Sequence, residues 1–129
     1  MKVYEKEIKV TADDLDDLKH VNNVRYVQWI QDISKEHWVF VTPDELSQNI
    51  FWVVRNHTIN YKNSAVLGDL INVRTYIKET KGALSVRSVE MFNQKTNQLL
   101  VSALTEWCLL SADTLKPLRV SQEIVKMFS

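Results

Sequence analysis

The chain has 129 residues, and its 16 basic and 16 acidic residues give a formal net charge of zero at pH 7. This lack of a basic excess argues against a nucleic-acid-binding protein. The single cysteine excludes an internal disulfide framework and, with no signal-peptide pattern, predicts a protein of the reducing cytoplasm. No stretch has the apolar length of a transmembrane helix, and the chain length predicts one domain over residues 1–129.

The first half of the chain predicts a strand, an acidic loop and one long helix. Residues 2–10 alternate, with Tyr4, Ile8 and Val10 on one face, which is typical of a strand with one wet side. Residues 11–21 contain four Asp and are expected to form a loop. Apolar residues then recur at helical spacing over residues 23–40, on a face so wide that we expect other structure to wrap the helix.

The second half changes to the period of a strand. Strands are expected over residues 51–61, 70–79, 83–92 and 98–110, and turn signals at 68–69 and 81–82 separate three of them. A short helix is expected in the tail after Pro117. The order of one strand, a long helix and four strands predicts an α+β domain, in which an antiparallel sheet curls around one apolar helix.

The start of the long helix combines features of an active site. Asn22 or Asn23 can cap it, because an Asn side chain accepts a hydrogen bond from a first-turn amide. The amides that remain free, and the positive end of the helix dipole, can receive an anion or a developing oxyanion. The acidic loop and His20 come directly before this end. Arg25 in the first turn opposes the dipole, so we expect a carboxylate of the loop to pair with it.

These residues resemble a known enzyme group. Residues 14–16, Asp-Leu-Asp, followed by His-Val-Asn-Asn at 20–23 and by Tyr26, are similar to the acid-loop signature of the hotdog-fold thioesterases, specifically the 4-hydroxybenzoyl-CoA thioesterase-like group. Residues 20–30 also resemble the plant acyl-ACP thioesterases, which carry two hotdog repeats in one chain. The resemblance implies a five-stranded antiparallel sheet of order 1-3-4-5-2 around one long central helix. It also implies a homodimer, or a dimer of dimers, whose second strands pair edge to edge.

Thioester hydrolysis needs an activated water or a nucleophile, and donors for the carbonyl oxygen as it gains charge. The resemblance implies that Asp16 is the catalytic carboxylate, as nucleophile or general base, and that the backbone N–H of Asn23 polarises the carbonyl. The alternative for Asp16 is a turn-forming residue of the loop. In the plant enzymes His20 would belong to the catalytic network, but Leu18 replaces their Asn. A structural hydrogen bond in the loop is therefore an equal alternative for His20.

The remaining candidates concern the substrate. Tyr26 is expected to help to build the acyl pocket, and Lys62, Lys81 and Arg87 are candidates for the carrier's phosphates, with solvated surface charge as the alternative for each. His37, on the apolar helix face, is expected to pack in the core. No His, Cys or carboxylate cluster has metal-ligand spacing. We therefore expect no metal and no cofactor, with coenzyme A present only as part of the substrate.

Taken together, the sequence predicts a cytoplasmic acyl-CoA thioesterase that hydrolyses a fatty or aryl acyl-CoA to the free acid and CoA. One alternative is an acyl-ACP thioesterase of the same fold, and another is a non-catalytic hotdog module that binds acyl-CoA. No nucleic-acid or membrane partner is expected. The choice among acyl groups rests on analogy, because a fold alone does not define a substrate.

Overall fold

The computed structural model describes residues 2–129. Its elements in chain order are β1 (Tyr4–Lys9), a short 3-10 helix η1 (Ala12–Asp14), α1 (Asn23–Val41), a second 3-10 helix η2 (Asp44–Ser47), β2 (Ile50–Tyr61), β3 (Leu70–Lys81), β4 (Leu84–Asn93), β5 (Leu99–Ser111) and α2 (Gln122–Met127). The expected helix and strands are all present. Where their first or last residues differ from the predicted ones, the difference is one or two residues. None of the helices in this part of the chain combines the length and the apolar content that crossing a membrane requires.

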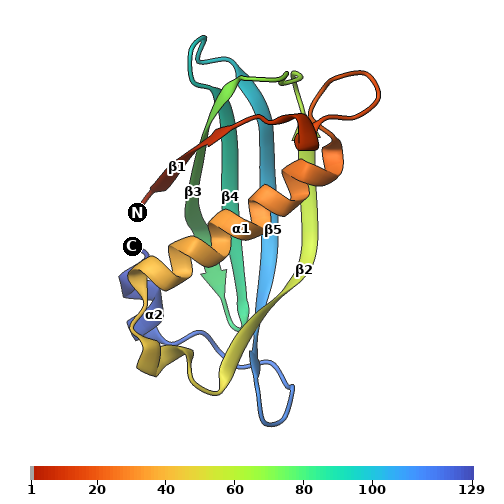
Figure 1. Ribbon diagram of the computed structural model, residues 1–129. Coiled ribbons are helices and arrows are strands. Elements are labelled where there is room, and N and C mark those ends of the chain that lie inside the picture. The colour runs from red at the N-terminus through yellow and green to blue at the C-terminus, as the bar shows by residue number, and fades with distance from the viewer. Residues whose placement is uncertain (1) are drawn as a thin grey trace.

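The five strands form one antiparallel sheet in the order β1-β3-β4-β5-β2, and α1 runs diagonally across one face of it (Figure 1). The predicted sheet order is confirmed. Strands β3, β4 and β5 follow one another through short turns, whereas β1 and β2 are the two edges. The outer edge of β2 is twelve residues long, and no strand within residues 2–129 covers it.

Three register shifts typical of β-bulges interrupt the sheet, between β2 and β5, between β3 and β4, and between β4 and β5. Val54 pairs with Trp107 and Asn56 with Glu106, so that Arg55 has no opposite residue in β5. The same happens in β3, where the register with β4 shifts between Ile77 and Glu79. An extra residue in one strand increases the local twist and bends the strand. These bulges are absent from the predicted pattern, because alternation alone does not reveal a single inserted residue.

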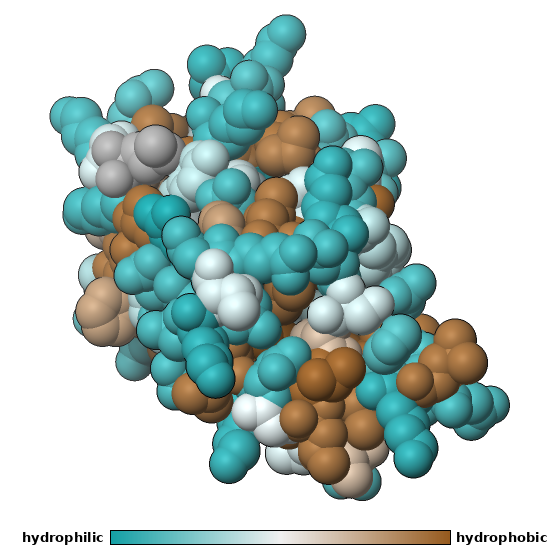
Figure 2. Space-filling model, turned by 90° about the horizontal axis from the view of Figure 1, so that it is seen from above, coloured by the Kyte–Doolittle hydropathy of each residue, from teal (hydrophilic) through white to brown (hydrophobic). Residues whose placement is uncertain are grey.

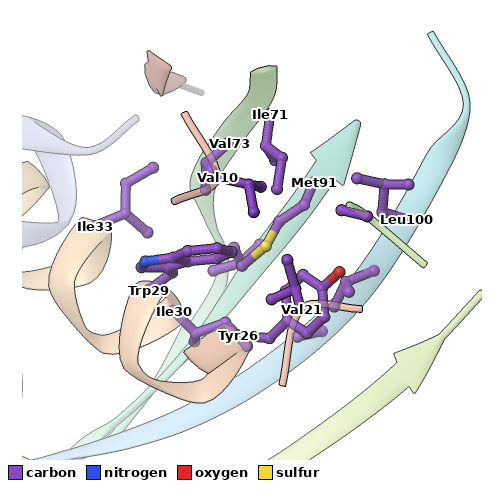
Figure 3. Packing of buried hydrophobic residues seen from close by; sticks show 14 residues of the cluster. Val10, Val21, Tyr26, Trp29, Ile30, Ile33, Ile71, Val73, Met91 and Leu100 are labelled. Atoms are coloured by element: carbon purple, nitrogen blue, oxygen red, sulfur yellow. The ribbon is translucent and has the colours of Figure 1, made fainter. Parts of the chain in front are cut away.

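The main core lies between the first half of α1 and the sheet. Tyr26, Trp29, Ile30 and Ile33 pack against strand residues such as Val73, all of them at most 7% exposed (Figure 3). Each fully buried large apolar side chain contributes about 1.5–3 kcal/mol relative to an exposed one. The wide apolar face predicted for the helix is therefore explained by a sheet that curls around it.

A second apolar cluster lies at the other end of α1. It joins Trp38 of α1 to Trp52 of β2, Leu109 of β5, and Ile124 of α2 and Phe128 beyond it. The tail helix α2 therefore covers the end of the sheet where the β3–β4 turn lies, and Val120 donates a backbone hydrogen bond to Gly82 in that turn. The main core therefore lies beside the first half of α1, and the second cluster lies beside its last turns.

Candidate active site

The acidic loop before α1 folds as a small hairpin. Leu15 and Val21 form a β-bridge, and the Asp16 amide donates to the His20 carbonyl at 2.7 Å. Lys19 adopts a positive φ of 62° and donates to the Asp16 carbonyl at 3.0 Å. The loop is anchored to the following segment because Val21 donates to the Ala65 carbonyl at 2.9 Å. These contacts hold the loop and the start of α1 in one orientation.

Asp16 uses one carboxylate oxygen to close this hairpin. Its Oδ1 accepts from the backbone amides of Leu18 at 2.9 Å and His20 at 3.1 Å, which is the Asx-turn geometry expected as its alternative role. Within residues 2–129 no donor bonds to the second oxygen, and the residue is partly buried. The turn role and a catalytic role therefore do not exclude each other, because they use different oxygens.

The neighbouring acid, Asp14, has a structural role. It is 8% exposed, and its Oδ2 accepts from the Thr11 amide at 2.8 Å in a capping box that starts η1. Its Oδ1 lies 3.0 Å from Nε of Arg25, and Arg25 also donates to the Asp13 carbonyl at 3.0 Å. The predicted pairing of Arg25 with the acidic loop is confirmed. It compensates a cation placed at the positive end of α1.

Capping leaves one free amide at the start of α1. Asn22 is the N-cap, and its side-chain oxygen accepts from the Val24 amide at 3.0 Å. The Arg25 amide donates to the Asn22 carbonyl at 2.8 Å. Nothing within residues 2–129 accepts a hydrogen bond from the Asn23 amide. The N–H that the sequence singled out is therefore unpaired, at the end of a helix whose dipole favours negative charge.

A pocket of about 120 Å³ opens beside this amide. Its wall consists of residues from the start of α1 and from the end of β2 with the loop after it, namely Val21, Asn23, Tyr26, Tyr61, Lys62, Asn63 and Ser64. The Tyr26 hydroxyl is buried, and burial raises its pKa. Three of the predicted residues, Asn23, Tyr26 and Lys62, are thus brought together. We call this cavity the small pocket.

Exposed apolar side chains surround this end of the molecule. Leu18, Val66 and Leu67, from the acidic loop and the loop after β2, are 76%, 44% and 61% exposed. Figure 2 views the molecule from this end and shows brown apolar surface between teal polar side chains. The surface around the small pocket therefore offers apolar as well as charged contacts.

Asp16 and His20 do not line the small pocket. The His20 side chain is exposed and forms no hydrogen bond with residues 2–129, while its backbone bonds to Asp16 and bridges to Val66. The loop is therefore held by backbone hydrogen bonds of His20 and not by its side chain, which was the structural alternative. The catalytic roles of Asp16 and His20 stay predictions.

Lys81 lies far from the small pocket. It pairs with Leu84 at the β3–β4 turn, whereas Val73 lies in the same row across the sheet as Tyr61 of the pocket. Eight residues of an extended strand separate Val73 from Lys81, which corresponds to about 26 Å. A phosphate contact by Lys81 therefore does not belong to the site around Asn23 of the same chain.

Arg87 is not the surface cation that the sequence suggested. It is 4% exposed and lies on the face of β4 that α1 covers, where its Nη1 donates to His37 Nδ1 at 2.8 Å and to Thr75 Oγ1 at 3.1 Å. The alternative of a solvated surface charge is wrong for this residue, because its side chain is buried. The signal was present in the sequence, since strand alternation places Arg87 on the same face as Val89 and Met91. The contact of Arg87 with the carrier's phosphates stays a prediction.

A larger pocket, of about 360 Å³, lies at the opposite end of α1. It is bounded by the second half of α1, the beginning of β2, the inner face of β3–β5 and α2, and Arg87 is part of its wall. Sequence reasoning did not find it, because its lining comes from segments far apart in the chain. We call it the large pocket.

The chain was compared with known proteins. The family model of the acyl-ACP thioesterase N-terminal domain matches residues 1–128. The chain belongs to this family. The hotdog thioesterase identification made from the acid loop is thereby confirmed, and with it a thioester hydrolase.

Individual relatives agree with this assignment. The long-chain acyl-CoA thioesterase FadM of Escherichia coli strain K12 is 27% identical over 124 residues, which cover 92% of this chain and 91% of that protein. The crystal structure of the probable thioesterase YbaW from Escherichia coli has a TM-score of 0.82 at 26% identity and covers 95% of this chain and 94% of that chain. The 12:0-ACP thioesterase of Umbellularia californica shares the fold, with a TM-score of 0.83 at 16% identity over 97% of this chain and 49% of that chain.

Proposed function

We propose that this member of the family is a thioesterase that hydrolyses a long-chain acyl-CoA to the free acid and CoA. The observation that carries the proposal is the unpaired Asn23 amide at the start of α1, in the wall of the small pocket. A long-chain substrate is supported by the name of the Escherichia coli relative and by the apolar large pocket.

In the proposed reaction the thioester carbonyl oxygen accepts a hydrogen bond from the Asn23 N–H. Negative charge that develops on this oxygen is stabilised by that bond and by the helix dipole. Asp16 either takes a proton from the attacking water or attacks the carbonyl carbon itself, through the oxygen that does not close the hairpin. When water attacks, the carbon–sulfur bond breaks, the CoA thiolate takes the proton that Asp16 accepted, and the acyl group leaves as the acid. When Asp16 attacks, CoA leaves as a thiolate that is protonated by water, and a water molecule then hydrolyses the acyl–Asp16 anhydride to the acid and the free carboxylate. No metal or other cofactor takes part.

The rest of the proposal concerns Lys62, His20, the assembly and the location of the protein. Lys62 is exposed at the small pocket, and we assign it, in preference to Lys81, to the phosphates of the carrier. His20 is assigned a positioning role beside Asp16. We also propose a homodimer, or a dimer of dimers, joined through the outer edge of β2, because a long unpaired edge strand is otherwise an aggregation hazard. A cytoplasmic location is part of the proposal.

The Asn23 amide can be tested by Asn23→Pro, which removes the N–H and keeps the helix start. Proline is favoured at the first helical position, and Asn22 already has the φ of −65° and ψ of 135° that a residue before proline needs. Turnover of a long-chain acyl-CoA should fall by about 10² to 10³, the usual effect of removing one oxyanion donor. The matched control, Asn23→Ala, keeps the N–H and should keep the rate. Equal rates in the two variants would remove this amide from the mechanism.

The carboxylate can be tested by Asp16→Asn, which keeps a side-chain oxygen for the amides of Leu18 and His20 but cannot act as base or nucleophile. Hydrolysis should fall by about 10² or more while the unfolding midpoint stays near that of the wild type. Asp17→Asn is the matched control, because Asp17 is exposed and its side chain makes no hydrogen bond within residues 2–129. Normal turnover in Asp16→Asn would show that Asp16 only shapes the loop.

An acyl-ACP substrate is the second candidate, favoured by the family model, which describes the N-terminal domain of acyl-ACP thioesterases. Assaying the same acyl chain on CoA and on an acyl carrier protein separates the two. Higher kcat/KM on the protein carrier would replace the proposed substrate. Binding without hydrolysis of either carrier would support a non-catalytic module.

A further inference from the structure

Arg87 is a buried cation without a counter-ion in the described chain. Four ion pairs form within residues 2–129, and Arg87 belongs to none of them. Its two hydrogen-bond partners, His37 Nδ1 and Thr75 Oγ1, carry no negative charge. Burial, then the nearby charges of Arg87 and Lys2, lowers the pKa of His37 to about 4, so His37 is neutral at pH 7. Burial lowers the pKa of Arg87 to about 10, which leaves the guanidinium charged.

A charge in this position is costly unless something compensates it. A buried ion that has lost its hydration needs an opposite charge or a full set of hydrogen bonds. Guanidinium has five N–H donors, and two contacts to one nitrogen, together with a Phe128 ring at 5.9 Å, account for only part of them. The remaining donors have no protein acceptor within residues 2–129.

The wall of the large pocket also carries positive charge without an acidic partner. Arg87 and Lys35 are its charged residues, and no Asp or Glu lines it. Trp52 and Trp107 also line it, and the indole N–H of each is buried without an acceptor in the described chain. The other walls are largely aliphatic and aromatic. The pocket thus combines apolar walls with positive charge, and no acidic side chain balances that charge.

We propose that the large pocket binds a carboxylate carried on an aliphatic chain, and that Arg87 is the residue that recognises the carboxylate. Guanidinium matches a carboxylate by two parallel hydrogen bonds, and the apolar walls bury the chain. This inference rests on the proposed function. The aliphatic chain is then the acyl group of the thioester, and the substrate class is a long-chain acyl-CoA with a second carboxylate at its far end. The same chemistry also fits a free fatty acid.

The position of the large pocket suits the distal end of a substrate. Ser34, which lines it, lies eleven residues after Asn23, or about 16 Å along the helix axis. The main core fills the space between them in one chain, since Ile30 and Ile33 are fully buried. Antiparallel pairing of two β2 edges would place the first residues of one β2, which line the large pocket, beside the last residues of the other, which line the small pocket. A long acyl group would then extend from the small pocket of one subunit to the large pocket of its partner.

The test begins with binding, which needs no hydrolysis. Dodecanedioic acid, dodecanoic acid and 1-dodecanol differ in their end groups, and binding to the wild type is followed through the fluorescence of the tryptophans that line the large pocket. We expect the acids to bind about ten- to a hundredfold more tightly than the alcohol, the range of a hydrogen bond to a charged group. Equal affinity for all three would overturn the proposal. This comparison uses the wild type alone, so it stands even where a variant does not fold.

Variants then place the effect at Arg87. Arg87→Met should abolish the preference for the acids, and Arg87→Lys should retain part of it, because the charge remains without the paired donors. Lys95→Met removes the same charge from an exposed turn outside the pocket and should change nothing. Unchanged acid binding by a folded Arg87→Met would overturn the assignment.

Turnover finally separates the two sources of the carboxylate. A higher kcat/KM for dodecanedioyl-CoA than for dodecanoyl-CoA, lost in Arg87→Met, identifies the far end of the substrate. Equal turnover with Arg87-dependent binding of dodecanoic acid identifies a free fatty acid as the occupant. If neither thioester is hydrolysed and Arg87-dependent acid binding remains, the proposed function fails and the carboxylate site stands.

Discussion

At the scale of single residues, His37 couples the stability of the fold to pH. Its side chain is 1% exposed, stacks on Tyr4 at 5.3 Å between ring centroids, and accepts the Arg87 hydrogen bond at Nδ1. The expectation that it packs in the core is confirmed, with the addition of a polar role. Protonation of Nδ1 would replace this acceptor by a donor that faces a cation.

The pKa of His37 is lowered from 6.5 to about 4 in the folded chain. Between these values the unfolded chain therefore binds a proton that the folded chain does not bind. The stability linked to His37 is fully present above pH 6.5 and is lost as the pH falls towards 4. The full effect corresponds to about 3 kcal/mol in the free energy of unfolding.

The measurement is urea unfolding of the wild type and His37→Asn across this pH range. Asn offers an oxygen where Nδ1 accepts, so Arg87 keeps an acceptor, and the free energy of unfolding should depend less steeply on pH. Burial also lowers the pKa of His57, but that contribution is common to both proteins and cancels in the comparison. His20→Asn, at an exposed position, is the control and should behave as the wild type does. Parallel pH curves for wild type and His37→Asn would refute the linkage.

At the scale of the elements, the start of α1 depends on a cap that the sequence left open between two neighbours. The structure assigns it to Asn22, whose side chain satisfies the Val24 amide, while the Asn23 side chain is exposed. Asn22→Ala should lower the free energy of unfolding by about 1 kcal/mol, and Asn23→Ala should leave it nearly unchanged. Chemical denaturation of the two variants decides this, and equal losses would mean that the cap does not stabilise the helix.

The sequence predicts the elements well and their lateral arrangement only through the resemblance. Alternation and helical spacing locate α1 and the strands, because burial on one face is a local property of the chain. The order of strands joins segments far apart, and no periodicity reports it. Arg87 is the clearest limit. Its acceptor His37 is fifty residues away, so the sequence did not show that a charge on an inner strand face would be tolerated.

The features of the site also differ in how far the sequence predicts them. Unpaired amides at the start of α1 were predictable, because helix starts leave amides unpaired at known positions. The choice of the Asn23 amide among them came from the resemblance. The joining of Tyr26, Tyr61 and Lys62 around it was not predictable, because β2 and α1 approach only through the fold of the whole sheet. The large pocket was also missed, since its wall combines α1, β2, β5 and α2.

At the scale of the whole molecule, the long outer edge of β2 predicts how two chains meet. Every second amide of an edge strand points away from the sheet and exchanges with solvent in a monomer. If two β2 edges pair, both sets of β2 amides should be protected, whereas the outward amides of β1, the other edge, should still exchange quickly. Residue-resolved hydrogen exchange measures this, and alternating protection along β2 at concentrations where the mass is that of two chains would rule out pairing there.

The same pairing makes activity depend on concentration. With the substrate thioester at the small pocket of one chain and its acyl end in the large pocket of the other, a separated chain holds only part of a long-chain substrate. Specific activity should therefore fall on dilution over the range in which sedimentation shows the mass dropping from twice 15.1 kDa to 15.1 kDa. A short-chain acyl-CoA, which does not reach the large pocket, should lose less. A separated chain with undiminished long-chain turnover would show that one chain contains the whole site.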